Sequence, residues 1–235
     1  MPLKKGDFIL MDFTGKVKET GEVFDTTIEE VAKEKRLYKE GEIYEPQLVV
    51  IGEGWVLKAL DENLADLEVG KKKSVEIPPE KAFGPHNPEK IKLVPLRRLT
   101  SRGITPTIGA RIEYEGKTAT VRTTGAGRVR LDFNPPLAGK TLIYEVTVKE
   151  KLETKQKKIT ALIHRRIPAV DATKFTLKTT KTMVKIGVPE EAFYLEGVQL
   201  AKRGIATDVQ RFFPEINRVK FIETFKRRAA GGKQG

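Results

Sequence analysis

Two neighbouring segments give the strongest indication of the fold: Met11-Asp12-Phe13-Thr14-Gly15, and then Gly21-Glu22-Val23-Phe24-Asp25-Thr26-Thr27. The apolar, β-prone run Asp7–Phe13 precedes the turn residues Thr20-Gly21-Glu22, and Val23-Phe24 follows them. An apolar run that meets a tight turn and then resumes is typical of a β-hairpin. The sequence therefore predicts β structure over residues 4–24, with two strands joined by a short turn.

Further strand and helix signals follow this hairpin. Gln47–Ile51 predicts a strand that ends at Gly52, and Ser74–Ile77 predicts another that ends at Pro78-Pro79. Leu142–Val148 predicts a third strand, and Ile28–Tyr38 a short charged helix or a loop. A helix that ends at Gly70 is indicated by apolar residues at helical spacing: Val56, Leu57, Leu60, Leu64 and Leu67.

A middle segment, residues 85–135, is rich in proline and glycine. It contains the short alternating runs Arg111–Tyr114, Thr118–Val121 and Arg128–Leu131, which favour a small β module over a helix or a linker. The lysine-rich stretch Lys149–Lys158 has no strong apolar period, so we place a domain boundary there.

The segment beyond this boundary has its own order of elements. It predicts strands at Ile159–Ile167 and Lys174–Ile186, a helix from Pro189 to Gly204, a short helix at Val209–Phe213 and a strand at Arg218–Phe225. The order β-β-α-α-β indicates a compact α+β domain over residues 151–226. Residues 227–235 are expected to form a disordered tail.

Composition excludes several classes of site. The 235 residues include no cysteine and only two histidines, His86 and His164. A disulfide framework, thiolate metal ligands and a cysteine nucleophile are therefore excluded, and we expect no metal and no cofactor. Gly52-Glu53-Gly54 imitates a dinucleotide-binding turn, but Leu57 stands where its third glycine belongs.

No membrane segment is expected either. No apolar run approaches the roughly 18 residues that cross a bilayer, and the N-terminus lacks the apolar region of a signal peptide. We therefore expect a cytoplasmic protein. Its positive charge is uneven, because residues 85–130 hold 10 basic and 3 acidic residues and residues 150–235 hold 19 and 9. Such asymmetry fits nucleic-acid contact, and a solvated surface equally well.

The motifs, taken in their order, resemble the FKBP-type peptidyl-prolyl isomerases. The resemblance covers roughly residues 4–84 and 131–150, and the inserted β segment with the following Asp132–Lys140 is similar to the SlyD subfamily. The segment beyond residue 150 is similar to the extra C-terminal domain of the long archaeal type. Besides the hairpin, the motifs are Ile51-Gly52, Val56–Leu60, Leu67–Gly70, Ile77–Gly84 and Leu142–Val146.

This resemblance implies an α+β fold. Residues 1–84 and 131–150 would form an antiparallel half-barrel sheet wrapped on a short helix. Residues 85–130 would form an insert-in-flap domain, a small all-β module that binds unfolded chains as a chaperone. Residues 151–226 would form a separate C-terminal α+β domain.

The resemblance also implies a pocket for X–Pro segments of polypeptides. Phe24 and Tyr144 would wall the proline ring, Leu60 would form the floor, and Asp25 would face the carbonyl. Leu57 would offer its backbone N–H to the peptide. Because Phe13 and Phe83 stand where tyrosine is usual, two hydroxyl donors are absent, and we expect altered affinity for macrolide inhibitors. The implied pocket is Phe13, Phe24, Asp25, Val56, Leu57, Leu60, Phe83 and Tyr144.

Client contact by the insert is expected from six apolar residues, which are equally candidates for the insert's own small core: Ile91, Leu93, Val94, Leu96, Leu99 and Ile104. A non-catalytic holding chaperone, or a binding protein held on RNA or the ribosome by its basic C-terminal segment, is the alternative function. A homodimer through the C-terminal domain also stays open, since these apolar residues fit either an interface or a core: Phe193, Leu195, Val198, Leu200, Phe212, Phe213 and Phe221.

Overall fold

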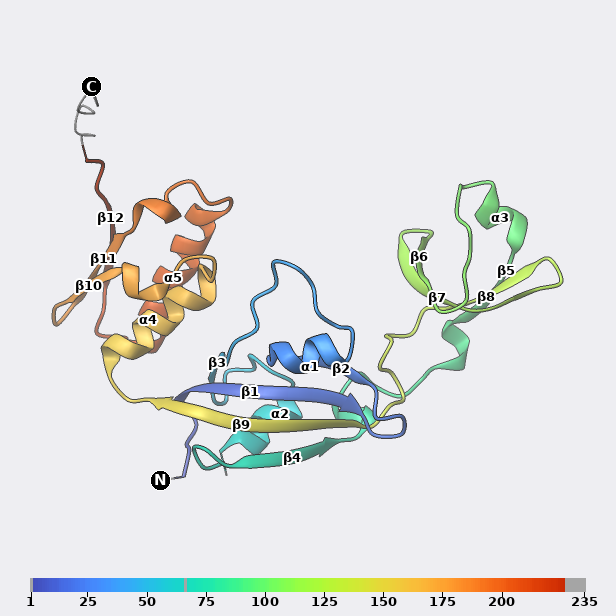
Figure 1. Cartoon of the computed structure of the whole chain (residues 1–235), viewed down its shortest axis with the longest axis horizontal. Coiled ribbons are helices and arrows are strands. Elements are labelled where there is room, and N and C mark those ends of the chain that lie inside the picture. The colour runs from blue at the N-terminus through green and yellow to red at the C-terminus, as the bar shows by residue number, and fades with distance from the viewer. Residues whose placement is uncertain (1, 66, 227–235) are drawn as a thin grey trace, which may run out of the picture.

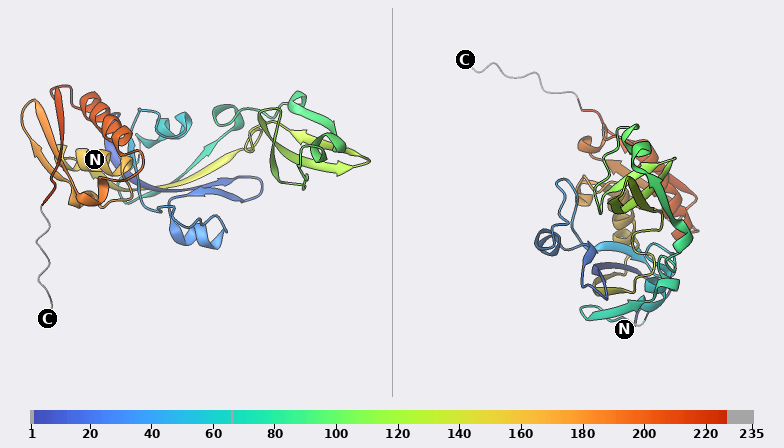
Figure 2. Two further views of the ribbon diagram at one scale, coloured as in Figure 1. Left: turned by 90° about the horizontal axis from the view of Figure 1, so that it is seen from above. Right: turned by 90° about the vertical axis from the view of Figure 1, so that its right-hand side faces the viewer.

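The computed structural model describes residues 2–65 and 67–226, and the tail expected at 227–235 lies outside them. The chain forms three sheets, each with its own hydrophobic core (Figure 1). The molecule is elongated, with the C-terminal part at one end, the segment inserted after residue 84 at the other, and the longest strands between them (Figure 2). No helix in the described residues is long and apolar enough to cross a membrane.

The central sheet is antiparallel and has the order β2-β1-β9-β4, with β3 also paired to β1. Its strands are β1 (Phe8–Val17), β2 (Val23–Thr26), β3 (Gln47–Val50), β4 (Lys72–Ile77) and β9 (Leu142–Leu152). β3 pairs with the first half of β1 and β2 with its second half. The short helix α2 (Lys58–Leu64) packs its buried residues Ala59, Leu60 and Leu64 into the core of this sheet. The predicted half-barrel on a short helix is thus confirmed, and α1 (Glu29–Glu34) fulfils the expectation at Ile28–Tyr38.

The continuous apolar run at the start of β1 has a structural cause. Ile9, Met11 and Phe13 point into the core of the central sheet, whereas Phe8 and Leu10 pack against the core of the C-terminal part. Alternate side chains of a strand lie on opposite faces, so a strand covered on both faces is apolar at successive positions. The first half of β1 is therefore shared by two cores.

The inserted segment forms a four-stranded sheet of order β5-β8-β7-β6. Its strands are β5 (Ile91–Pro95), β6 (Arg111–Tyr114), β7 (Lys117–Gly125) and β8 (Arg128–Asp132). β7 and β8 are joined by a turn in which Ala126 and Gly127 have positive φ angles of 47° and 69°, as a tight hairpin requires. The β module is confirmed, with one addition: the single-turn helix α3 (Leu96–Thr100), whose Leu99 fills the small core.

A buried carboxylate anchors the hinge between the insert and the central sheet. Asp132 is 1% exposed. Its side chain accepts hydrogen bonds from the Asn134 N–H at 2.9 Å and from Arg122 at 2.8 Å, and it lies 3.1 Å from His86 Nε2. Nearby, the Gly139 N–H donates to the Gly84 carbonyl at 2.8 Å, so the two ends of the insert lie side by side.

We expect Asp132→Ala to loosen the insert. Burial alone raises the pKa of Asp132, but the hydrogen bonds from Asn134, His86 and Arg122 outweigh it and hold this pKa far below its ordinary value. The folded-state pKa is thus lower than the unfolded value of about 3.9, so the stabilisation is complete above about pH 4 and lost as pH falls further. Removing the carboxylate should cost about 3 kcal/mol, as for one partner of a buried ion pair.

Hydrogen exchange measures this effect strand by strand. Asp132→Ala should reduce protection in β7 and β8 while leaving β4 unchanged, and Asp132→Asn, which keeps the side-chain shape, should lose less. Equal protection of the insert in all three proteins at pH 7 would contradict the assigned role of Asp132.

The C-terminal part is an α+β unit with the order α-β-β-α-β, not the predicted β-β-α-α-β. It contains α4 (Lys155–Arg166), β10 (Thr176–Thr179), β11 (Met183–Val188), α5 (Val198–Phe212) and β12 (Arg218–Glu223). The strand predicted at Ile159–Ile167 was wrong. Ile159, Leu162 and Ile163 are buried on one face of α4 at helical spacing, and the Thr154 hydroxyl accepts the Lys157 N–H to cap its start. The three β-branched isoleucines Ile159, Ile163 and Ile167 misled the prediction.

Two further boundaries differ in this region. The segment predicted as one strand, Lys174–Ile186, holds β10 and most of β11, which are antiparallel. The two predicted helices are one, α5, which begins at Val198 and not at the predicted Pro189. Gly204 does not end a helix: a Cβ there would lie 3.0 Å from the guanidinium carbon of Arg166, which crosses α5 to pair with Asp208. Gly204 was thus wrongly interpreted as the end of a helix, whereas its lack of a side chain leaves space for Arg166.

The C-terminal core extends into the central sheet. Phe8, Leu48, Val50 and Leu152 belong to the same buried cluster as α4 and α5. Trp55 packs edge-on against Phe212, with ring centroids 5.7 Å apart, and α5 also pairs Arg211 with Glu53. Within the predicted boundary Lys149–Lys158, β9 ends at Leu152 and α4 begins at Lys155. The division into residues 1–84 with 131–150, 85–130 and 151–226 stays a prediction: the insert has a core of its own, whereas the C-terminal core also takes in residues of β1 and β3.

Candidate active site

An aromatic pocket lies where the central strands meet α2. Phe13 comes from β1, Phe24 from β2 and Tyr144 from β9. The Tyr144 ring centroid is 5.9 Å from that of Phe13 and 5.7 Å from that of Phe24, with the Phe24 ring almost perpendicular to it. Leu60 of α2, 2% exposed, belongs to the same core cluster. These four residues define what we call the aromatic pocket.

A glycine allows these rings to approach one another. Gly15 pairs with Asp25 on one side and with Tyr144 on the other. A Cβ at Gly15 would lie 2.7 Å from Phe24 Cζ and 3.2 Å from Tyr144 Cε1. The absence of a side chain at this position therefore lets the Phe24 ring lie across β1 and contact Tyr144.

The loop before α2 supplies Val56 and Leu57, which pack against the same core. The Leu57 carbonyl accepts the Asp61 N–H at 2.9 Å and so begins α2. Within residues 2–65 and 67–226, no hydrogen-bond acceptor faces the Leu57 N–H. This backbone donor is available to a peptide, as the resemblance implies.

Asp25 lies at the rim of the pocket. Desolvation raises the pKa of its carboxyl above the ordinary value, the negative charge of Glu42 adds to the effect, and the Thr26 N–H and Lys39 oppose it. Desolvation, and then the charge of Asp25, raises the pKa of Tyr144 to about 12, so its hydroxyl stays protonated. Asp25 and Tyr144 are the two polar side chains among the eight predicted pocket residues, one an acceptor and one a donor.

Phe83 is not part of the core cluster that holds the aromatic pocket. It is 40% exposed and lines a separate cavity of about 320 Å³ together with Phe24. The flap residues Pro135, Pro136 and Leu137 form another wall of this cavity, and they were not among the predicted site residues. The sequence could have indicated these three residues as site residues, because they belong to the Asp132–Lys140 motif.

Two threonines hold the pocket strand in place. The Phe13 N–H donates to Thr27 Oγ1 at 3.0 Å, the Thr27 N–H donates to the Phe13 carbonyl at 3.1 Å, and the Thr26 hydroxyl donates to the same carbonyl at 3.0 Å. Both belong to the quoted hairpin motif, but only the fold shows that they position Phe13.

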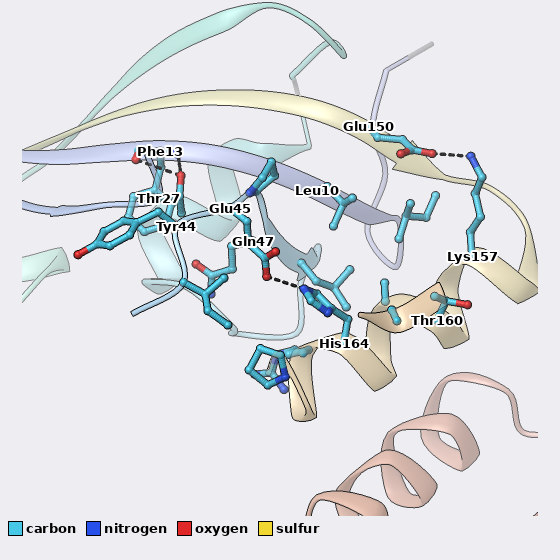
Figure 3. A pocket seen from close by; sticks show the side chains of 18 of the residues that line it. Leu10, Phe13, Thr27, Tyr44, Glu45, Gln47, Glu150, Lys157, Thr160 and His164 are labelled. Atoms are coloured by element: carbon cyan, nitrogen blue, oxygen red, sulfur yellow. Dashed lines mark hydrogen bonds and ion pairs between the residues drawn. The ribbon is translucent and has the colours of Figure 1, made fainter. Parts of the chain in front are cut away.

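A cavity of about 1100 Å³, which we call the α4 groove, begins at Phe13 of the aromatic pocket (Figure 3). Phe13, Asp25 and Thr27 line the end that meets the pocket. The groove then runs between the loop 41–47 and helix α4. Nothing in the sequence indicated this groove, since it joins segments more than one hundred residues apart.

The six apolar residues of the insert do not share one surface. Val94 and Leu99 are buried in the core of the insert, and Leu96 and Ile104 pack partly against it. Leu93 is 55% exposed, and Ile91 is partly exposed. Leu93 and Ile91 can therefore contact a client without rearrangement of the insert. Val94 and Leu99 instead form the insert's own small core, which was the alternative expected for them.

The apolar C-terminal residues divide in the same way. Phe193 and Val198 are buried in the C-terminal core, and Leu195, Phe212, Phe213 and Phe221 pack partly against it. Leu200 is 74% exposed. Core packing thus accounts for six of these seven residues, and nothing in the structure supports the dimer or the RNA contact. In the part of the chain that the structure describes, no three His, Asp or Glu side chains gather as a metal site.

The antiparallel sheet wrapped on a short helix, with aromatic side chains gathered near one carboxylate, defines an α+β protein with an apolar candidate site. Comparison identifies the family. The family described as FKBP-type peptidyl-prolyl cis-trans isomerase matches residues 1–149, and the domain described as FKBP26_C-terminal matches residues 155–226. The chain therefore belongs to the FKBP-type peptidyl-prolyl cis-trans isomerases, with a SlyD-like insert and a C-terminal domain of the FKBP26 type.

Individual relatives agree with this assignment. The chain is 36% identical over 148 residues to the short-type peptidyl-prolyl cis-trans isomerase of Methanocaldococcus jannaschii, covering 63% of this chain and 93% of that protein. It is 29% identical over 110 residues to the FKBP-type 16 kDa isomerase of Escherichia coli strain K12, covering 45% and 73%. It is 30% identical over 120 residues to SlyD of Treponema pallidum, covering 49% and 68%. The protein is thus an enzyme whose substrates are polypeptides.

Proposed function

We propose that the X–Pro bond of the substrate rotates in the aromatic pocket. The barrier of roughly 18–20 kcal/mol arises from amide resonance, which the twisted transition state loses. No covalent bond breaks, so the site needs no nucleophile and no metal. An apolar pocket favours the twisted amide because the loss of resonance makes it less polar than the planar ground state.

The observation that carries this proposal is the perpendicular contact of Phe24 and Tyr144 above Leu60, with Asp25 at the rim. The two rings, in contact with each other, would present apolar surface to the proline ring. The Leu57 N–H would bind a carbonyl of the peptide and hold the chain still while the bond turns. Asp25 and the Tyr144 hydroxyl would provide the polar contacts to the rotating amide, one accepting and one donating.

Removing the carboxylate tests the site directly. Asp25→Ala should lower kcat/KM for a short X–Pro peptide about tenfold, the size of effect expected for one polar contact made in the transition state. Because desolvation raises the pKa of Asp25, the wild-type rate should also fall on acidification with a midpoint above the ordinary aspartate value. A protease-free conformational assay across pH measures both.

Asp25→Asn is the matched control. It keeps the side-chain shape but removes the charge, so it should abolish the acid limb while folding normally. An Asp25→Ala protein with wild-type kcat/KM would remove Asp25 from the catalytic site.

We also propose that the insert binds unfolded substrate chains as a chaperone module. Leu93 presents an exposed apolar side chain on β5, and β5 and β6 are the two edge strands of the sheet. An extended chain can add to such an edge through backbone hydrogen bonds. Binding there would raise the concentration of X–Pro segments near the pocket.

A further inference from the structure

The α4 groove adjoins the aromatic pocket at Phe13, which belongs to both. From Phe13, Asp25 and Thr27 the groove extends to His164 and Thr160 of α4 (Figure 3). Its volume is about 1100 Å³. Cavities for small ligands span roughly 300–1,000 Å³, so this space accommodates more than one proline and its neighbours.

The chemistry of the groove suits a polypeptide backbone with apolar side chains. Leu10 and Leu48 give it an apolar floor, and Ala161 an apolar wall. The Gln47 side chain lines the groove and has no hydrogen-bond partner within residues 2–65 and 67–226. A primary amide offers both a donor and an acceptor, which is the pair that an extended peptide presents.

Most charges in the groove are already compensated. His164 Nε2 lies 2.6 Å from Glu45 Oε1, which joins α4 to the loop 41–47, and Lys157 pairs with Glu150 at 2.6 Å (Figure 3). Arg165 and Asp25 differ, because neither pairs with an opposite charge in the described part of the chain, and the Arg165 guanidinium stacks on the Trp55 ring at 4.0 Å. With one unpaired charge of each sign, the groove favours a segment that is apolar and neutral.

We propose that the α4 groove binds the stretch of the polypeptide substrate that flanks the X–Pro bond, as an extended apolar chain. The C-terminal domain then contributes one wall of the substrate site itself. The proposal rests on the proposed function, since the groove is a substrate site only if the X–Pro bond occupies the adjoining pocket. Its consequence is that substrate length, beyond the proline and its neighbours, raises kcat/KM.

A blocking substitution separates the groove from the pocket. Thr160 faces the groove and makes no side-chain hydrogen bond in the described residues, so Thr160→Tyr fills the space without removing a contact. Thr207→Tyr on α5 is the matched control, because Thr207 is exposed and lies outside the groove. Each full-length protein is assayed on a short X–Pro peptide and on a longer peptide that adds apolar residues on both sides of the same core.

The expected result is a loss for one substrate only. Thr160→Tyr should lower kcat/KM for the longer peptide by about fivefold, roughly 1 kcal/mol of binding, and leave the short peptide unchanged. Thr207→Tyr should change neither. Gln47→Ala, on the opposite wall, should weaken the longer peptide in the same selective way, which guards against a folding defect of the first variant.

Three outcomes would overturn the proposal. Equal kcat/KM ratios for long and short peptides in wild type and Thr160→Tyr would mean that the groove is not a substrate site, although the pocket is active. No acceleration of either peptide by the wild type would overturn the proposed function together with the groove. A change of oligomeric state caused by Thr160→Tyr, seen in sedimentation, would assign the groove to a second copy of the chain.

Discussion

Replacing residues 86–130 by a short loop should slow catalysis of a proline-limited refolding reaction by about 100-fold. Tethering a second binding site typically multiplies affinity by 10²–10⁴ through effective concentration alone, so loss of the insert removes this gain. Catalysis on a short X–Pro peptide should stay at the wild-type level, because every residue of the aromatic pocket lies outside the replaced segment. The adjacent ends of the insert, joined by the Gly139–Gly84 hydrogen bond, allow a short loop to close the chain.

A point variant refines the same prediction. Leu93→Ser removes the exposed apolar side chain of β5 and should reduce refolding catalysis several-fold, whereas Val69→Ser, exposed on the central part of the molecule, should not. Equal refolding catalysis with and without the insert would show that the insert is no client-binding module. Loss of refolding catalysis with aggregation of the substrate still suppressed would support the holding-chaperone alternative.

Gly15→Val should lower kcat/KM for every X–Pro peptide by about 100-fold. The new Cβ would lie 2.7 Å from the tip of the Phe24 ring, so the ring must move out of contact with Tyr144. Displacing a binding group by about 1 Å is sufficient for a loss of this size. Since the crowded atom is the far end of a side chain and not backbone, the sheet should survive while the pocket does not.

Gly125→Val is the matched control for this effect. Gly125 also lies in a strand, and no atom stands within 4 Å of its missing Cβ. That variant should keep wild-type peptide kinetics, and both proteins should retain the wild-type far-ultraviolet circular dichroism. A Gly15→Val enzyme with normal kcat/KM would show that the Phe24–Tyr144 contact does not hold the proline.

The elements that sequence reasoning predicted correctly are those with strong local signals. The run Leu142–Val148 alternates cleanly and lies within β9, and the hairpin at the start of the chain forms β1 and β2. The helix predicted from Val56 to Gly70 exists as α2, but it ends at Leu64, and Leu67 packs into the core from beyond its end. Helix α4 was wrongly predicted as a strand. Isoleucine favours strands, but the apolar residues of this segment also recur at helical spacing, so the pattern fits both elements. Only packing against α5 and β3 decides between them.

In the candidate site, too, the residues with a local motif were predicted and those that depend on the fold were not. The hairpin motif placed Phe13, Phe24 and Asp25, and the fold brings them to Tyr144 from the far end of the chain. The exposure of Phe83 and its cavity with Pro135, Pro136 and Leu137 could not be predicted, because they depend on the path of the flap after Gly84. The α4 groove could not be predicted either, since its walls come from segments more than one hundred residues apart.

The pairing of β1 with β9 has a consequence for synthesis on the ribosome. Phe8 pairs with Leu152 and Val17 with Leu142, so one edge of the first strand must wait for its partner until nearly two thirds of the chain has been translated. Residues 91–132, which pair only among themselves, emerge completely before β9 does. Domains generally fold as units during synthesis. If the insert binds unfolded chains, it would be folded on the nascent chain before the catalytic sheet is complete. The apolar strand β1 of that sheet, still without β9, would then be a nearby segment that the insert could bind.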